Sequence, residues 1–253
     1  MSRRRTQETS TKLANQAPFP YADYVDARKT LKAALKGPCF YALLTGASGM
    51  GKTALLRDIT ESLDKHRFNI IYLTSANISL VSIVRFLAGR LHVGARRSYL
   101  ETVDVIVETI HGQTAHTVLW LDEADQLDRD TLQEIRTLAE HKLVAEQLLT
   151  VVFSGLPEIA TKLEAPMLFP LKRRIAHRCL LTGLRRDELD PFIEHRFGTQ
   201  DSMRVPDNAR DDLFERTMAA PALIDQVVRH ALARSKGPVD PEVFRAVLDT
   251  HGL

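Results

Sequence analysis

The sequence predicts an α/β fold, in which a five-stranded parallel sheet with flanking helices is followed by a small all-helical domain. Five short apolar runs of strand length alternate with segments whose apolar residues recur at helical spacing. A glycine-rich loop, residues 46–53, joins the first run to the first helical segment. From Arg185 onward the apolar residues follow helical spacing only. The predicted strands are residues 39–45, 68–74, 117–123, 148–153 and 179–184.

Breaking and capping residues separate the helical segments. Gly37-Pro38 ends the first helix, Asp128 or Asp130 is a candidate N-cap in mid-chain, and Pro206 and Gly237-Pro238 divide the C-terminal helices. The predicted helices are residues 23–35, one starting near Lys52, then 79–91, 99–110, 130–142, 187–197, 209–218, 221–233 and 241–249.

Residues 46–53 read Gly-Ala-Ser-Gly-Met-Gly-Lys-Thr and match the phosphate-binding pattern G-x-x-x-x-G-K-[ST]. Glycines let the backbone turn so that successive N–H groups point at phosphate oxygens. We expect Lys52 to reach the β- and γ-phosphates of ATP and the Thr53 hydroxyl to ligate Mg²⁺. The residues expected to bind the nucleotide are Gly46, Ala47, Ser48, Gly49, Met50, Gly51, Lys52, Thr53 and Ala54.

The third apolar run, Thr-Val-Leu-Trp-Leu-Asp-Glu, ends in two carboxylates. We expect Asp122 to hold Mg²⁺ through water and Glu123 to orient and deprotonate the water that attacks the γ-phosphate. The alternative is that Glu123 only caps the following helix. Residues 122–125 also spell the DEAD motif of helicases, but no other helicase motif occurs and the chain is too short for two motor domains.

Two later segments supply further candidates. Ser154, at the end of the fourth run, is placed to touch the γ-phosphate or the attacking water, or else it serves the turn into Gly155-Leu156-Pro157. Arg174 is the leading candidate for an arginine finger that reaches the γ-phosphate of a neighbouring subunit, with Arg173 and Arg178 as substitutes. The alternative for these arginines is a solvated basic patch or ion pairs with the acidic part of the chain.

Composition and charge limit the function. The chain has 253 residues, 44% hydrophobic and 26% charged, with a net charge of +2. No apolar run reaches the roughly 18 residues that span a membrane, which favours a cytoplasmic protein without membrane contact. Cys39 and Cys179 are expected to be buried thiols rather than a disulfide. The predicted domains are a disordered basic tail (1–17), a nucleotide-binding domain (18–184) and a helical domain (185–253).

The charges are unevenly distributed. Residues 65–100 contain no Asp or Glu but several Lys and Arg, and an acidic segment follows. Such asymmetry favours a polyanion-binding edge, and Arg96 and Arg97 are the first candidates for contacts with DNA phosphates. The alternative is that these arginines only keep a helix face soluble. The basic tail, likewise, either touches nucleic acid or stays solvated, and Phe19 or Tyr21 either covers a nucleotide base or packs in the core.

These parts, in this order, resemble the AAA+ ATPases. The resemblance rests on residues 46–53, Asp122-Glu123, Ser154, Arg174 before the last strand, and the C-terminal helices, and it covers the chain from about Pro18 onward. It implies an AAA+ P-loop NTPase core followed by an all-helical lid domain. Within AAA+, residues 152–158 resemble the "V-G-x-P-E" turn of the ExeA, TniB and TnsC group.

Residues 221–224 resemble the "P-R-x-I" segment of that group but carry Ala222 where an arginine is frequent. A lid contact to the γ-phosphate is therefore missing or is supplied by Arg216 or Arg229, and we expect slow, regulatory turnover. Compact relatives of the TnsC, TniB and MuB type imply ATP-dependent assembly of copies of the chain on double-stranded DNA, as a ring or filament. They also imply recruitment and activation of a transposase, with an adaptor for target choice. The alternatives are a secretion or assembly ATPase of the ExeA type and a signalling or defence NTPase.

Overall fold

The computed structural model describes residues 17–74, 78–94, 96–140, 149–235 and 237–252. The tail predicted for residues 1–17 lies, except for Ala17, outside the described residues. The chain divides into two compact units. The sheet unit contains residues 26–47 and 59–181, and the helical unit contains the described residues up to Val25, residues 48–58 and the residues from Thr182 onward.

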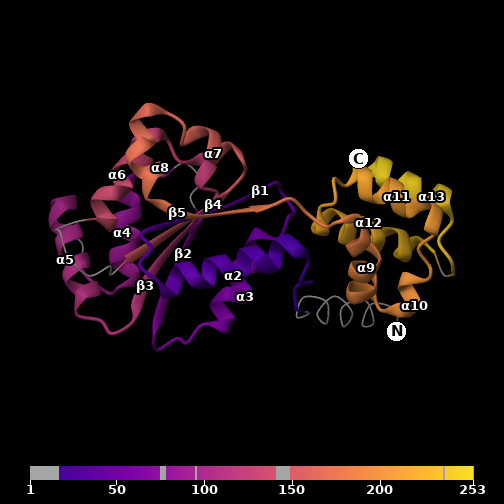
Figure 1. Ribbon diagram of the computed structural model, residues 1–253, viewed down its shortest axis with the longest axis horizontal. Coiled ribbons are helices and arrows are strands. Elements are labelled where there is room, and N and C mark those ends of the chain that lie inside the picture. Colours follow the sequence, from indigo (N-terminus) through magenta and orange to yellow (C-terminus); the bar gives the residue numbers. More distant parts are fainter. Residues whose placement is uncertain (1–16, 75–77, 95, 141–148, 236, 253) are drawn as a thin grey trace. The chain divides into compact units, whose positions relative to one another are not determined.

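A parallel five-stranded sheet forms the centre of the sheet unit, in the order β2-β3-β4-β1-β5 (Figure 1). Thr45 pairs with Gly155, and Leu121 pairs with Phe153, so the strands end at a common edge. Parallel strands buried on both faces need nearly continuous apolar runs, and β1, β3 and β4 are buried almost throughout. The strands are β1 (Tyr41–Gly46), β2 (Phe68–Thr74), β3 (His116–Asp122), β4 (Leu149–Gly155) and β5 (Ile175–Leu181).

Both faces of the sheet are covered. One face carries Leu43, Leu119 and Phe153 and packs into a core cluster with buried residues of α4 (Leu80–Arg90), α5 (Tyr99–His111) and α6 (Arg129–Ala139). The alternate residues of the strands, which include Trp120, lie on the opposite face, where α2 (Ala22–Lys36) lies in Figure 1. The sheet unit is thus the predicted layered α/β structure.

The predicted elements agree with the observed ones except near the fifth strand. β5 begins at Ile175, four residues before the predicted start, and its buried residues Ile175 and Cys179 are separated by the exposed Ala176 and Arg178. The basic run that precedes it ends a short helix instead. Ser79 and Asp128 are the observed N-caps of α4 and α6. Leu148 and the predicted end of the helix 130–142 lie outside the described residues. The remaining elements of this part are α3 (Lys52–Ser62), η1 (Ala124–Gln126), α7 (Glu158–Lys162), η2 (Pro166–Leu168) and α8 (Phe169–Arg174).

The C-terminal part of the helical unit is all-helical, as predicted. Its apolar positions at helical spacing, among them Ile193, Leu213, Ile224 and Phe244, are fully buried. The elements are η3 (Arg186–Glu188), α9 (Leu189–Phe197), α10 (Thr199–Ser202), α11 (Asp207–Arg216), α12 (Pro221–Arg234) and α13 (Pro241–Thr250).

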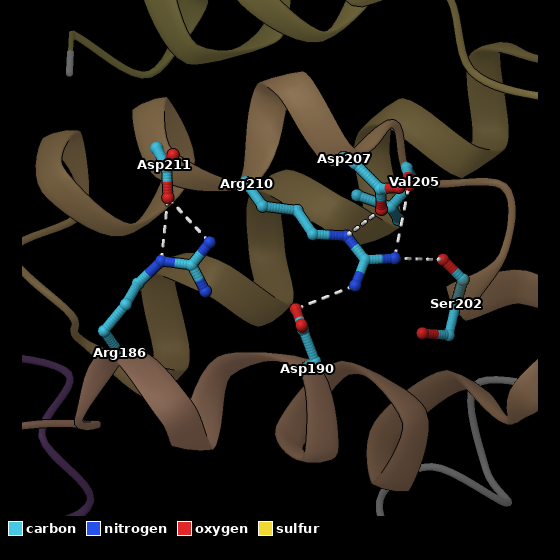
Figure 2. A network of polar contacts seen from close by, with 7 residues as sticks. All are labelled: Arg186, Asp190, Ser202, Val205, Asp207, Arg210 and Asp211. Carbon is cyan, nitrogen blue, oxygen red and sulfur yellow. Dashed lines mark hydrogen bonds and ion pairs between the residues drawn. The ribbon is translucent and has the colours of Figure 1, made fainter.

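Arg210 joins three segments of this helical part, as Figure 2 shows. From α11 its guanidinium lies 2.7 Å from Asp190 of α9 and 3.4 Å from Asp207. It also donates to the carbonyl oxygens of Ser202 and Val205, at 3.2 and 3.4 Å. The side chain of Arg210 is only 13% exposed, so these contacts replace most of its hydration.

Both cysteines are buried free thiols, as predicted. Burial raises the pKa of Cys179 to about 11 and also raises the pKa of Cys39. None of the helices in the described residues is long and apolar enough to cross a membrane.

Candidate active site

The glycine loop lies between β1, which ends at Gly46, and α3, which begins at Lys52. Gly49 and Gly51 have φ angles of +81° and +94°, a region that other L-residues rarely adopt. The turn therefore requires glycine at positions 49 and 51, and Gly51 is also a fixed position of the motif. Lys52 and Thr53 are the first two residues of α3, at the helix end where N–H groups have no partner within the helix and the dipole favours anions. Thr53 is exposed and Lys52 is half-buried.

Tyr21 supports the loop from the N-terminal segment of the helical unit. Its ring is 2% exposed, and its hydroxyl donates to the carbonyl oxygen of Met50 at 2.5 Å. Burial, followed by the nearby Asp23 and Glu188 carboxylates, raises the pKa of Tyr21 well above its usual range, so the hydroxyl remains a donor. Phe19 packs edge-on against Phe192. Both aromatic residues thus take the packing role that the sequence left open.

The first turn of α12 contacts the same loop within the helical unit. The N–H of Ala222 donates to the carbonyl oxygen of Gly49 at 3.1 Å. The two arginines considered as substitutes for a lid arginine are paired with carboxylates: Arg216 lies 2.5 Å from Asp249, and Arg229 lies 2.7 Å from Asp225. At residue 222 the helix is therefore linked to the loop by a backbone hydrogen bond, at the position where the group that the sequence resembles often has an arginine.

In the sheet unit, the carboxylate of Asp122 ends β3 and is 7% exposed. Its Oδ1 accepts from the Ser154 hydroxyl at 2.5 Å and from the N–H of Glu123 at 3.0 Å. Its Oδ2 accepts from the Tyr72 hydroxyl at 2.7 Å. The indole N–H of Trp120 donates to Ser154 Oγ at 2.9 Å. Asp122 and Ser154 are thus brought together, as the sequence predicts.

Glu123 follows directly and has φ and ψ of 54° and 34°, the left-handed region. That conformation costs a residue with a side chain about 1–2 kcal/mol, and such strain concentrates at functional sites. The residue is exposed and stands at the cap position of η1, but its carboxylate makes no capping hydrogen bond. The structure therefore gives no support to the capping alternative.

Asp125, the last residue of the DEAD motif, connects the segment after β3 to the segment after β4. Its Oδ1 accepts from the N–H of Leu156 at 2.9 Å. Lys162 donates to the carbonyl oxygens of Asp125 and Leu127 at 2.5 and 2.6 Å. These contacts fix the loop after Glu123 to the segment after Ser154, which gives Asp125 a structural role.

Arg174 is the last residue of α8, and its side chain is 45% exposed. Its Nη2 lies 3.2 Å from Glu140 Oε2, while Oε1 of the same carboxylate accepts from the Tyr41 hydroxyl at 2.9 Å. Burial, and then the Glu140 carboxylate, raise the pKa of Tyr41 far above its usual range. Arg178 donates to the Lys172 carbonyl at 2.9 Å, and Arg173 is exposed. Arg174 thus forms an ion pair within its own chain.

Arg96 and Arg97 lie on the connection between α4 and α5, not among the carboxylates at the strand ends. Both side chains are exposed. The Arg96 N–H donates to Thr102 Oγ1 at 2.9 Å. Exposed guanidinium groups suit contacts to phosphates.

Tyr72, Trp120 and Glu140 support site residues but are not among the sequence-based candidates, and the sequence does not predict that Tyr21 supports the glycine loop. The alternation of side chains along a strand could have indicated Trp120, because it puts Trp120 and Asp122 on one face of β3. Tyr72 lies opposite Trp120 in the parallel register of β2 and β3. Tyr21 and Glu140 act over long sequence separations that no local pattern reveals.

Comparison with known proteins bears on this site. The family model described as AAA domain matches residues 39–163, from just before β1 into α7. The general secretion pathway protein A of Aeromonas hydrophila is 26% identical over 200 residues, which is 76% of this chain and 36% of that protein.

Among solved structures, the ORC2 protein of Aeropyrum pernix, described in ADPNP and ADP complexes, matches with a TM-score of 0.66 and 13% identity over 90% of this chain. The ORC1 protein of the same organism, in complex with DNA, matches with a TM-score of 0.63 and 18% identity over 92% of this chain. The chain spans 66% and 65% of those two chains, and a smaller part of the secretion protein. The identities are low, so these structures establish the fold alone.

Proposed function

From the AAA+ P-loop NTPase fold, with an AAA domain at residues 39–163, we propose that this chain is an ATPase that works as an assembly switch on DNA. The loop of residues 46–54 binds the phosphates, with Lys52 as the point charge at the β- and γ-phosphates. Glu123 activates the attacking water. The observation that carries this proposal is the Asp122 carboxylate, fixed by hydrogen bonds beside a left-handed Glu123 at the end of β3.

Magnesium fits these residues. Mg²⁺ takes oxygen ligands and is usually held by one or two carboxylates together with substrate phosphates and water. Asp122 offers a carboxylate whose orientation is fixed by neighbours, and Thr53 offers a hydroxyl at the start of α3. When bound, the metal neutralises charge on the β- and γ-phosphates.

Self-assembly follows from Arg174, which we propose as the finger for the γ-phosphate of a neighbouring copy. Its half-exposed guanidinium at the end of a helix is accessible to another subunit, and arginine matches phosphate geometry. Because residue 222 is alanine rather than arginine, the chain turns ATP over slowly, and the ATP-bound assembly persists. Residues 185–253 act as the lid domain of this switch.

The assembly binds duplex DNA through Arg96 and Arg97, in a segment without carboxylates. Contacts of this kind are insensitive to base sequence and weaken steeply with salt. A structural neighbour solved with DNA is consistent with this role. In the cytoplasm, such an assembly selects target sites for a transposase, which it recruits and activates together with an adaptor.

A secretion or assembly ATPase is the second candidate. The observation that favours it is the 26% identity to general secretion pathway protein A over 76% of this chain. In that role the switch acts on a membrane-associated partner, and DNA affinity is absent.

Fluorescence anisotropy of a labelled DNA duplex separates the two candidates. We expect tight binding with a non-hydrolysable ATP analogue, weak binding with ADP, and a steep loss between about 50 and 200 mM salt. Arg96→Ala/Arg97→Ala should weaken binding, while Lys29→Ala/Lys36→Ala, two cations of α2 outside the proposed surface, serves as the matched control. Equal or absent DNA binding in all nucleotide states would favour the secretion role.

A further inference from the structure

Hydrogen bonds from Tyr72, Glu123 and Ser154 fix the carboxylate of Asp122, and they use both of its oxygens. One donor is the backbone of the next residue, which any amino acid would supply. The other two are the hydroxyls of Tyr72 and Ser154, which come from β2 and β4 on either side of β3. The carboxylate is therefore held from both neighbouring strands.

The two hydrogen bonds of the Ser154 hydroxyl have directions that are determined by its partners. An indole N–H only donates, and a serine hydroxyl has a single proton to give. Because Trp120 donates to Ser154 Oγ at 2.9 Å, the hydroxyl accepts there and gives its proton to Asp122 Oδ1. Trp120 is fully buried and packed in the sheet, so it fixes the orientation of the hydroxyl.

Tyr72 is held in an equally defined position. It lies opposite Trp120 in the register of β2 and β3, on the face of the sheet that carries Asp122. Its hydroxyl donates to Asp122 Oδ2 at 2.7 Å, and a carboxylate oxygen can only accept there.

We propose that Tyr72 and Trp120 are positioning residues for the metal-holding carboxylate: Tyr72 acts directly on Asp122, and Trp120 acts through Ser154. The inference rests on the proposed function, in which Asp122 holds Mg²⁺. It also assigns the single proton of Ser154 to Asp122, so Ser154 acts on the nucleotide through this carboxylate. Groups that orient a ligating carboxylate in this way typically change metal affinity by about 10- to 100-fold when they are removed.

The test is the metal dependence of nucleotide affinity, measured at equilibrium and without turnover. Binding of a fluorescent ATP analogue is titrated in excess Mg²⁺ and in EDTA, and the ratio of the two Kd values reports the contribution of the metal. We expect Tyr72→Phe to reduce this ratio by about 10-fold while leaving the Kd in EDTA unchanged. Tyr99→Phe is the matched control, since it removes the hydroxyl of another half-buried tyrosine, at the start of α5.

The second arm uses Trp120→Phe and Ser154→Ala. Each substitution should lower the ratio of the two Kd values. The double variant Trp120→Phe/Ser154→Ala should have nearly the same ratio as Ser154→Ala alone, because the indole acts only through the serine. Trp120 is the only tryptophan of the chain, so wild-type protein should also change its intrinsic emission when Mg²⁺ is added to the ATP complex.

The outcomes distinguish the two proposals. An unchanged ratio in Tyr72→Phe, or equal weakening in Mg²⁺ and EDTA, would overturn the positioning role while leaving ATP binding intact. A wild-type chain that binds no ATP analogue would overturn the proposed function, and this inference with it.

Discussion

The hydroxyl of Tyr21 gives the sharpest test of how the glycine loop is held. It lies 2.5 Å from the carbonyl oxygen of Met50, and the two residues are 2% and 4% exposed. Tyr21→Phe keeps the ring, which packs with its centroid 5.7 Å from that of Tyr24, and removes only the donor. A buried carbonyl group then lacks its partner.

Leaving one buried acceptor unsatisfied costs about 1–2 kcal/mol of the free energy of unfolding. The lost hydrogen bond also destabilises the conformation of the loop that we propose binds phosphate. If all of this free energy is lost from nucleotide binding, the Kd for ATP rises about 5- to 30-fold, since 1.4 kcal/mol corresponds to a factor of ten.

Denaturant unfolding measures the first quantity, and titration with a fluorescent ATP analogue measures the second. The control is Tyr24→Phe, a neighbouring buried tyrosine whose hydroxyl donates to Asp58 at 3.1 Å and to the Ala54 carbonyl oxygen at 3.4 Å, both in α3. We expect it to lower stability but to leave the Kd for ATP within about twofold of wild type. Unchanged stability in Tyr21→Phe would refute the hydrogen bond as a support. Lower stability with an unchanged Kd would refute its role in shaping the loop.

Other changes give equally definite expectations. Glu123→Gln should bind ATP and DNA but lose hydrolysis, measured as phosphate release; assembly that fails in this variant would contradict Glu123 as the base. Arg174→Ala should bind ATP yet lose hydrolysis, and normal turnover would move the finger to another arginine. Arg210→Ala should lower the free energy of unfolding by about 2 kcal/mol, and a loss below about 0.5 kcal/mol would mean that its contacts are weak. Because burial raises the pKa of Cys179 from 9.0 to about 11, its contribution to stability is present below pH 9 and is lost as the pH rises toward 11; unfolding curves of Cys179→Ala should lack this loss.

The strands and helices were predictable because each depends on a local pattern. Residues buried on both faces must be apolar in unbroken runs, and the glycines at positions 49 and 51 are required by positive φ angles. The start of β5 was misplaced, since the charged residues around Arg178 hide a strand whose buried residues alternate with exposed ones.

The support of the site was less predictable, because it depends on register and on distant contacts. Tyr72 and Asp122 are 50 residues apart, and Tyr41 and Glu140 are 99 apart. Local patterns in a single sequence do not reveal the strand order that brings such pairs together. Loop motifs predict which residues contact a nucleotide, whereas the groups that orient those residues are determined by the tertiary fold.

ATP-dependent assembly on DNA is the central claim, and electron microscopy with a duplex tests it most directly. With a non-hydrolysable ATP analogue and Mg²⁺, we expect ordered assemblies of many copies along the duplex, absent with ADP and absent for Lys52→Ala. Particles that remain single copies in every nucleotide state, at concentrations that saturate ATP binding, would contradict it.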